Sequence, residues 1–307
     1  MIGGSQKNAD NNVPQPTWQY WDRYEVMGEK GSRYVYAPEL RREEGRWKKN
    51  KSRTYPPLIR GGLFFKFARL ADYGDLDPAV RPEDLDTDNN AQVAYDWADQ
   101  WGVLGLTMGE TAEGRADAST IGGTGDTVIR FAEEAWVANA VLRLYEAATR
   151  ESGPDVATIY EVMEYGGVSW RWRQFYTSTP ERAMDWALVS AAGQTQERVT
   201  RYCHPALYRQ PGHNHFREAP AFRNLLGALW LEMFWLLLSN DTRRCHNAEC
   251  NRVVPFEPTP ARDLFAESVR TTGYATRVDK RYCSKRCANR HYYKTTTKAR
   301  RRASRPG

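Results

Sequence analysis

The clearest pattern in the middle of the chain is the helical spacing of its apolar residues. Apolar side chains recur three and four positions apart, which is typical of amphipathic helices. Turn-forming and glycine-rich segments separate these stretches. No convincing run of alternating apolar and polar residues is present, so the pattern predicts a mostly α-helical domain. The predicted helices are residues 63–71, 91–106, 128–149, 180–202 and 221–240.

The most apolar segment is LLGALWLEMFWLLL, residues 225–238, which contains Glu232. A membrane-spanning helix needs about 20 apolar residues, so this segment predicts a buried core helix instead. The first twenty residues lack the basic start and apolar run of a secretory signal. We therefore expect a cytoplasmic protein with no membrane partner.

Polar composition and charge divide the chain into three parts. Residues 1–16 are polar and predict a disordered tail. Residues 1–240 carry 27 Lys+Arg against 32 Asp+Glu, whereas residues 241–307 carry 17 against 6. The net charge of +6 therefore combines a mildly acidic α-rich domain, 17–240, with a strongly basic C-terminal segment, 241–307. A concentrated basic segment favours a polyanionic partner.

The charge run ELRREEGRWKKNKSR, residues 39–53, lies within a stretch, 17–62, whose fold the pattern does not predict. A solvated charged surface is the simplest interpretation of this run.

The chain has five cysteines, and four of them form two late pairs: Cys245 with Cys250, and Cys283 with Cys287. An odd number of cysteines without an export signal favours metal binding over a disulfide framework. Zn²⁺ takes four thiolates in a tetrahedron, and four thiolates leave no open position for water. The pairs therefore predict one structural Zn²⁺, with the neighbouring His246 and His291 as substitute ligands.

The sequence around each pair predicts how the site is built. CHNAEC, residues 245–250, precedes VVPF and is interpreted as a turn followed by a strand. YCSKRCANRHYY, residues 282–293, is interpreted as the start of a helix, whose N-terminus stabilises thiolate charge. A knuckle with one pair and a helix N-terminus with the other is the arrangement of treble-clef zinc fingers.

The segment KRYCSKRCANR resembles the treble-clef finger named for its Cys-Gly-Asn-Arg signature (CGNR), found on bacterial regulators. Cys287, Asn289 and Arg290 carry the signature, with Ala288 at the position of the glycine and a longer insert between the pairs. The resemblance covers only about residues 243–302. It implies a finger that closes an α-rich domain, and it implies DNA-binding transcriptional regulation, in which the α-rich domain senses a small molecule or a protein partner.

Basic residues recur every fourth position after the second cysteine pair. On a helix this spacing gives a stripe that drifts by about 40° per step, and like charges four apart destabilise the helix unless a polyanion relieves them. The four thiolates and Zn²⁺ carry a net negative charge that nearby cations balance, but the far end of the stripe lies beyond that field. We therefore predict a nucleic-acid contact, with duplex DNA as the expected partner. The predicted contact residues are Arg286, Asn289, Arg290, Lys294, Lys298, Arg300, Arg301 and Arg302.

Within this segment Asn289 is a candidate for reading a base edge. Tyr292 and Tyr293 are expected to pack on the zinc knuckle, with stacking on unpaired bases as the alternative. Thr295 to Thr297 are poor helix formers, so the helix is expected to fray there and continue as a flexible basic arm.

Two other functions stay open at this point. A treble-clef module also suits docking to a protein or to RNA. An enzyme in residues 17–240 with an accessory finger is the third hypothesis, but no nucleophile with a base and no carboxylate pair stands out, so we do not expect catalysis.

Overall fold

The computed structural model of the protein is mostly helical, which confirms the predicted fold class. It describes residues 18–38, 40–43, 46–55, 57–60, 62–72, 74–79, 81–106, 125–165, 179–209, 216–238, 244–247, 250, 252–254, 281–283 and 285–303. The predicted tail 1–16 and most of the insert between the cysteine pairs lie outside these ranges.

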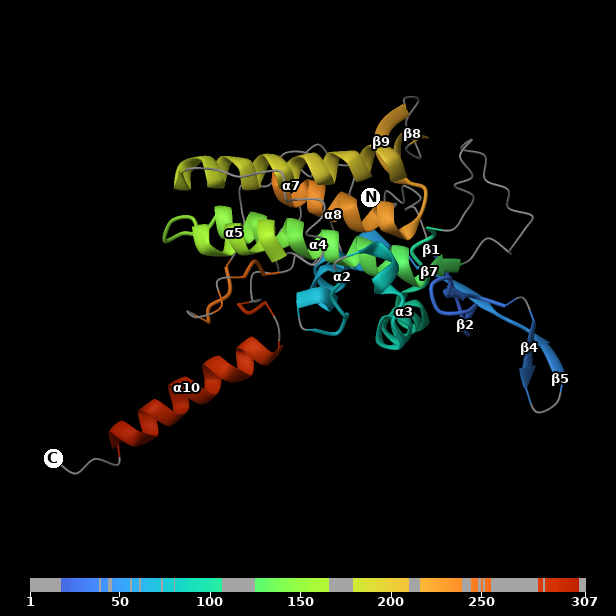
Figure 1. The fold of residues 1–307 in the computed structure, drawn as a ribbon, viewed down its shortest axis with the longest axis horizontal. Coiled ribbons are helices and arrows are strands. Elements are labelled where there is room, and N and C mark those ends of the chain that lie inside the picture. Colours follow the sequence, from blue (N-terminus) through green and yellow to red (C-terminus); the bar gives the residue numbers. More distant parts are fainter. Residues whose placement is uncertain are drawn as a thin grey trace, which may run out of the picture.

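The helix α4 (Val128–Ala148) lies at the centre of the helical body (Figure 1). It packs against α2 (Leu63–Asp72), α3 (Asp88–Trp101), α5 (Val156–Tyr165) and α7 (Pro180–Tyr202). Most of its side chains are buried, and many of them are alanines. Small side chains let the neighbouring helices approach closely, so α4 is enclosed on most of its circumference.

Threonines begin three of these helices. The hydroxyl oxygens of Thr87, Thr127 and Thr179 each accept a hydrogen bond from the backbone N–H three residues later, at the starts of α3, α4 and α7. Such N-caps satisfy one of the backbone donors that a helix start leaves unpaired.

The apolar segment at α8 (Leu225–Leu238) is a buried helix, as predicted. It packs on α7 and α2, and it also contacts the short helix α1 (Pro57–Arg60). Its carboxylate, Glu232, accepts a hydrogen bond of 2.9 Å from the backbone N–H of Phe64 at the start of α2. Burial raises the pKa of Glu232 to about 8, against the lowering effect of the backbone donors around it.

The predicted helix 221–240 starts too early, because residues up to Phe222 belong to a strand. β8 (Cys203–Arg209) and β9 (Phe216–Phe222) form an antiparallel ribbon between α7 and α8. The chain continues directly from α7 into β8. Cys203, the fifth cysteine, is buried there, and its thiol donates to the carbonyl of Gly227 (3.4 Å).

The predicted helix 91–106 ends early, at Trp101 in α3. Gly102 follows with a φ of +89°, and a side chain there would come within 2.9 Å of the Trp18 ring nitrogen. The next residues form no helix, and a buried carboxylate, Asp126, accepts the N–H groups of Leu104 and Leu106. Long-range pairing therefore overrides the helical spacing of this segment.

Residues 18–55 form short antiparallel strands, which the periodicity did not predict. β1 (Trp18–Trp21) pairs with β6 (Ser52–Tyr55), and β4 (Leu40–Glu43) pairs with β5 (Arg46–Lys49). A three-stranded sheet has the order β2, β3, β7, with bounds Glu25–Met27, Tyr34–Tyr36 and Gly125–Thr127. A 3-10 helix, η1 (Pro82–Leu85), precedes α3.

Among the described helices, none combines the length and the apolarity that a membrane span requires.

The buried carboxylate of α8 gives a testable pH dependence. Glu232 stays protonated in the folded protein up to about pH 8, whereas the unfolded chain releases this proton near pH 4.5. Between pH 6 and pH 8 its contribution to the free energy of unfolding should therefore fall by up to about 1.4 kcal/mol per pH unit. Glu232→Gln, which mimics the protonated form, should remove this decline in denaturant titrations. Equal slopes in the variant and the wild type would contradict the assignment.

Candidate metal centre

A short knuckle carries the first cysteine pair. Arg244 and Val253 form an antiparallel β-bridge, and the N–H of Cys245 donates to the carbonyl of Arg252 (2.9 Å). The N–H of Cys250 donates to the carbonyl of Asn247 (2.8 Å), which closes the turn. This matches the predicted knuckle followed by an extended segment.

The second pair lies at the start of α10 (Lys285–Ala303). Cys283 precedes the helix and Cys287 lies in its first turn, so the spacing of four residues, which would place both on one face of a helix, does not do so here. The N–H of His246 donates to the carbonyl of Arg281 (2.8 Å), which joins the knuckle to the segment before α10.

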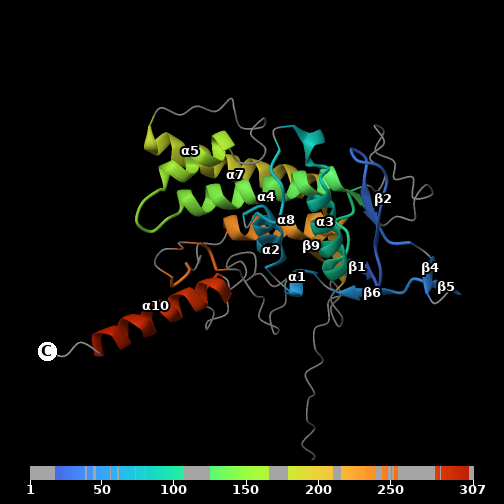
Figure 2. The ribbon, with the colours of Figure 1, turned by 60° about the horizontal axis from the view of Figure 1, so that its bottom comes forward.

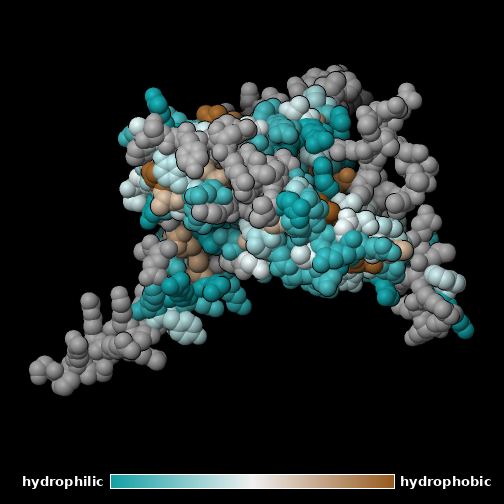
Figure 3. Space-filling model, in the orientation of Figure 1, coloured by the Kyte–Doolittle hydropathy of each residue, from teal (hydrophilic) through white to brown (hydrophobic). Residues whose placement is uncertain are grey.

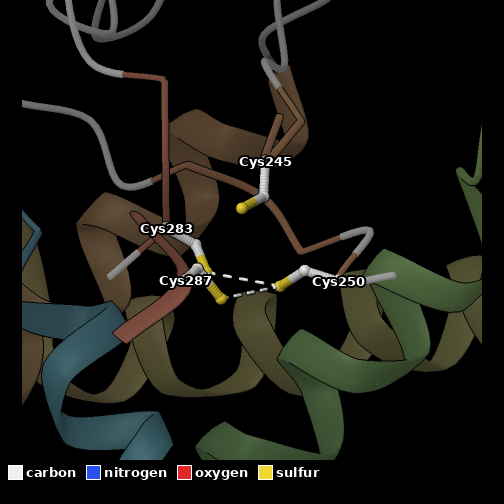
Figure 4. Close-up of side chains that lie close together, drawn as sticks. All are labelled: Cys245, Cys250, Cys283 and Cys287. Carbon is white, nitrogen blue, oxygen red and sulfur yellow. Dashed lines mark hydrogen bonds between the residues drawn. The ribbon is translucent and has the colours of Figure 1, made fainter. Parts of the chain in front are cut away.

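The four sulfur atoms converge from these two segments (Figure 4). All of them lie within 4.8 Å of one another. The sulfurs of Cys250, Cys283 and Cys287 are separated by 3.4 to 3.5 Å. A disulfide requires about 2.05 Å, whereas Zn–S bonds of about 2.3 Å in a tetrahedron place the sulfurs about 3.8 Å apart. The arrangement therefore fits one zinc ion with four thiolate ligands.

The thiols affect one another's protonation. Hydrogen bonding from Cys283 lowers the pKa of Cys250, which favours the thiolate form of this sulfur. The same contact, together with burial, raises the pKa of Cys283. Burial also raises the pKa of Cys245. Because metal binding requires thiolates, a bound Zn²⁺ would displace the remaining thiol protons and supply the positive charge that stabilises these sulfurs as thiolates.

Within the described part of the chain, these four cysteines form the only cluster of potential metal ligands. The two candidate histidines both contact one aromatic ring beside the cluster, that of Tyr282. The Tyr282 ring centroid is 6.2 Å from that of His246 and 5.5 Å from that of His291. The cysteines are therefore the ligand set that the structure assembles.

A buried arginine on α2 holds both cysteine segments against the helical body. Arg69 is 6% exposed and donates to the carbonyls of Cys283 and Val253, each at 3.1 Å. Its guanidinium also lies 3.7 Å from the carboxylate of Glu146 on α4. One side chain therefore connects the knuckle, the start of α10 and the two central helices.

Further contacts support this connection. Glu146 accepts the N–H of Val253 (2.7 Å), and Arg244 donates to the carbonyl of Thr149 (2.7 Å) at the end of α4. Val253 itself belongs to the main hydrophobic core. The division at residue 240 stays a prediction, but the described contacts across it are extensive.

Sequence reasoning had only a partial signal for Arg69. This residue lies four positions after the buried Phe65, and therefore on an apolar face of α2, where a charged residue requires a partner. Nothing local indicated that partner, because Val253 and Cys283 are 184 and 214 positions away.

The helix α10 carries the predicted nucleic-acid contacts. Arg286, Asn289, Arg290 and Lys294 have exposed side chains. Lys298, Arg300, Arg301 and Arg302 lie on the same helix, but their side chains are outside the described set. The expected fraying at the threonines is wrong, since α10 runs without a break to Ala303.

The tyrosines of α10 do not pack on the knuckle as expected. Tyr292 and Tyr293 are 64% and 67% exposed, with their ring centroids 6.1 Å apart. Figure 2 shows α10 extending away from the helical body, and the surface over its first turns is hydrophilic (Figure 3). The tyrosines therefore add aromatic surface to a basic helix.

Comparisons with known protein families, curated proteins and solved structures find no match for this chain. The resemblance to the CGNR finger therefore rests on the residues of the cysteine segments alone.

The metal site makes a direct prediction. The purified protein should hold one zinc per chain, and Cys250→Ser or Cys283→Ser should lose the metal and the ordered knuckle, because that segment has little core of its own. Cys203→Ser is the matched control, since the fifth cysteine lies outside the cluster and serine can also donate to Gly227. Metal analysis measures the zinc content, and circular dichroism measures the loss of ordered structure. A metal-free wild type with an ordered knuckle would refute the site.

The anchoring role of Arg69 gives a second testable prediction. Arg69→Gln should lower the free energy of unfolding by about 3–5 kcal/mol, because it leaves Glu146 and two carbonyls without their buried cation. Zinc affinity should also fall, by about 10- to 100-fold, since Arg69 orients the Cys283 backbone. Denaturant titration and competition with a chelator measure the two effects. Unchanged zinc affinity would mean that the anchor does not support the ligands.

Proposed function

We propose that the chain is a zinc-finger nucleic-acid-binding protein, and that α10 binds duplex DNA in transcriptional regulation. The observation that carries the proposal is the composition and exposure of α10. Its 19 residues include eight Lys or Arg and no Asp or Glu. The described basic side chains of its first three turns are exposed.

The geometry supports a contact with a nucleic-acid backbone. A helix of 19 residues is about 28 Å long, and an α-helix fits the major groove of B-form DNA. Cations four positions apart on one helix repel each other, and phosphates relieve that repulsion. The cysteine cluster fixes the N-terminal end of α10 on the helical body. The helix would therefore contact the duplex from a fixed position.

The charge balance of the metal site does not account for the whole helix. Four thiolates with Zn²⁺ carry a net charge of −2, and Arg69 already provides one buried cation beside Cys283. Arg290 and Lys294 are exposed one and two turns beyond Cys287. A solvated polyanion explains these outer cations better than the metal does.

The resemblance to the CGNR finger adds the regulatory part of the proposal. On that basis the α-rich part binds a small molecule or a protein partner. Asn289, which is exposed on α10, is the proposed base-reading residue.

One observation favours a second candidate, RNA or single-stranded DNA. Tyr292 and Tyr293 are exposed beside the basic residues, and base stacking on aromatic side chains is typical of single-strand binding. Binding of labelled duplex DNA, single-stranded DNA and RNA across a salt series separates the two candidates. Preference for the duplex supports our proposal, and preference for a single strand supports the second candidate.

The helix makes the corresponding mutational prediction. The triple variant Arg290→Gln/Lys294→Gln/Lys298→Gln should weaken duplex binding, and its zinc content should be unchanged. The slope of log K against log salt should become shallower by about 0.9 for each phosphate that α10 no longer neutralises. The matched control is Lys30→Gln/Arg81→Gln/Arg182→Gln, which removes the same charge from exposed positions elsewhere. If both triple variants show the same salt dependence, α10 does not contact phosphate.

A further inference from the structure

The β4–β5 hairpin is a second exposed basic element, far from the cysteine cluster. In Figure 1 and Figure 2 it lies at the end of the molecule opposite to α10. All four residues of β5 are exposed: Arg46, Trp47, Lys48 and Lys49. The hairpin therefore presents cations and an aromatic ring to solvent.

The charge of this element contrasts with that of its surroundings. Residues 40–55 carry seven Lys or Arg and two Glu, a net charge of +5. The other residues of 1–240 carry 20 Lys+Arg against 30 Asp+Glu, a net charge of −10. A polyanion is thus attracted to the hairpin and to α10 and repelled by the acidic remainder.

The hairpin also has features that a structural role does not explain. Trp47 is 69% exposed, although tryptophan is usually largely buried. The two strands pair over four residues each, and a two-stranded ribbon is marginally stable by itself. A ligand bound along its exposed strand β5 would stabilise it.

We propose that the β4–β5 hairpin is a second contact for the same duplex DNA, an inference that rests on the proposed function. A two-stranded ribbon fits the major groove as an α-helix does. Arg46, Lys48 and Lys49 contact backbone phosphates. Trp47 packs its ring against the apolar part of the groove or of the sugars.

The positions of the two elements set the length of DNA that both can contact. In both views the two elements lie at opposite ends of the helical body, and α7, the longest described helix of that body, has 23 residues and is about 35 Å long. One turn of duplex DNA has about this length and contains about 10 base pairs. Simultaneous contact therefore requires a duplex of clearly more than one turn.

Duplex length gives the test. The wild-type protein is titrated with two duplexes of the same composition, one of about 10 and one of about 30 base pairs. It should bind the longer duplex at least about tenfold more tightly, because two contacts on one duplex reinforce each other. Arg46→Gln/Lys48→Gln/Lys49→Gln should abolish most of this preference and lower the salt dependence on the longer duplex. The Lys30→Gln/Arg81→Gln/Arg182→Gln control should keep the preference.

The outcomes separate this inference from the proposed function. If the hairpin variant keeps the same preference as the control, the hairpin does not contact DNA, while binding through α10 stands. If the wild type binds neither duplex at low salt, the proposed function fails and the inference fails with it. Circular dichroism and zinc content of each variant exclude a loss of fold as the cause.

Trp47 is tested separately. Trp47→Ala leaves every charge in place, so it should weaken binding to the longer duplex by about 3- to 10-fold without changing the salt dependence. Unchanged affinity in this variant would overturn the role of the ring.

Discussion

The position of the basic helix α10 depends on one buried cation. Arg69 donates to the carbonyls of Val253 and Cys283, which belong to the two cysteine segments, and it is anchored in turn beside Glu146 on the central helix. Without it, the two carbonyls would lose this donor and Glu146 would lose its buried cation, at a cost that a small segment cannot offset from its own packing. The four cysteines and Arg69 therefore act as one unit. The cysteines join the two segments, and the arginine fixes them on the helical body.

In this arrangement the cysteine cluster does more than stabilise its own segment, because it also fixes that segment on the helical body. A zinc finger on a flexible linker positions its helix relative to DNA only, whereas this knuckle also contacts α2 and α4. The start of α10 is connected to α4 through Cys283, Arg69 and Glu146. The structure thus provides a short physical connection between the helical body and the proposed DNA-binding helix.

The amino-acid sequence predicted the features that depend on local pattern or on residue type. Helical spacing identified α2, α4 and α7 closely, and the paired cysteines identified the cluster. The predictions failed where distant residues decide the structure: α3 ends at Trp101 because Asp126 accepts the next N–H groups, and β9 replaces the expected start of α8 because it pairs with β8. The short N-terminal strands had no detectable period, since three or four residues are too few to show alternation. The anchoring role of Arg69 was also beyond local patterns, because its partners lie far along the chain.

The central claim is that four thiolates hold one zinc ion at the origin of α10. X-ray absorption at the zinc edge of the purified full-length protein tests it most directly, because it reports the ligand type and the bond length. The account predicts four sulfur neighbours at about 2.3 Å. A first shell that includes nitrogen at about 2.0–2.1 Å, from His246 or His291, or a protein without bound zinc, would contradict it.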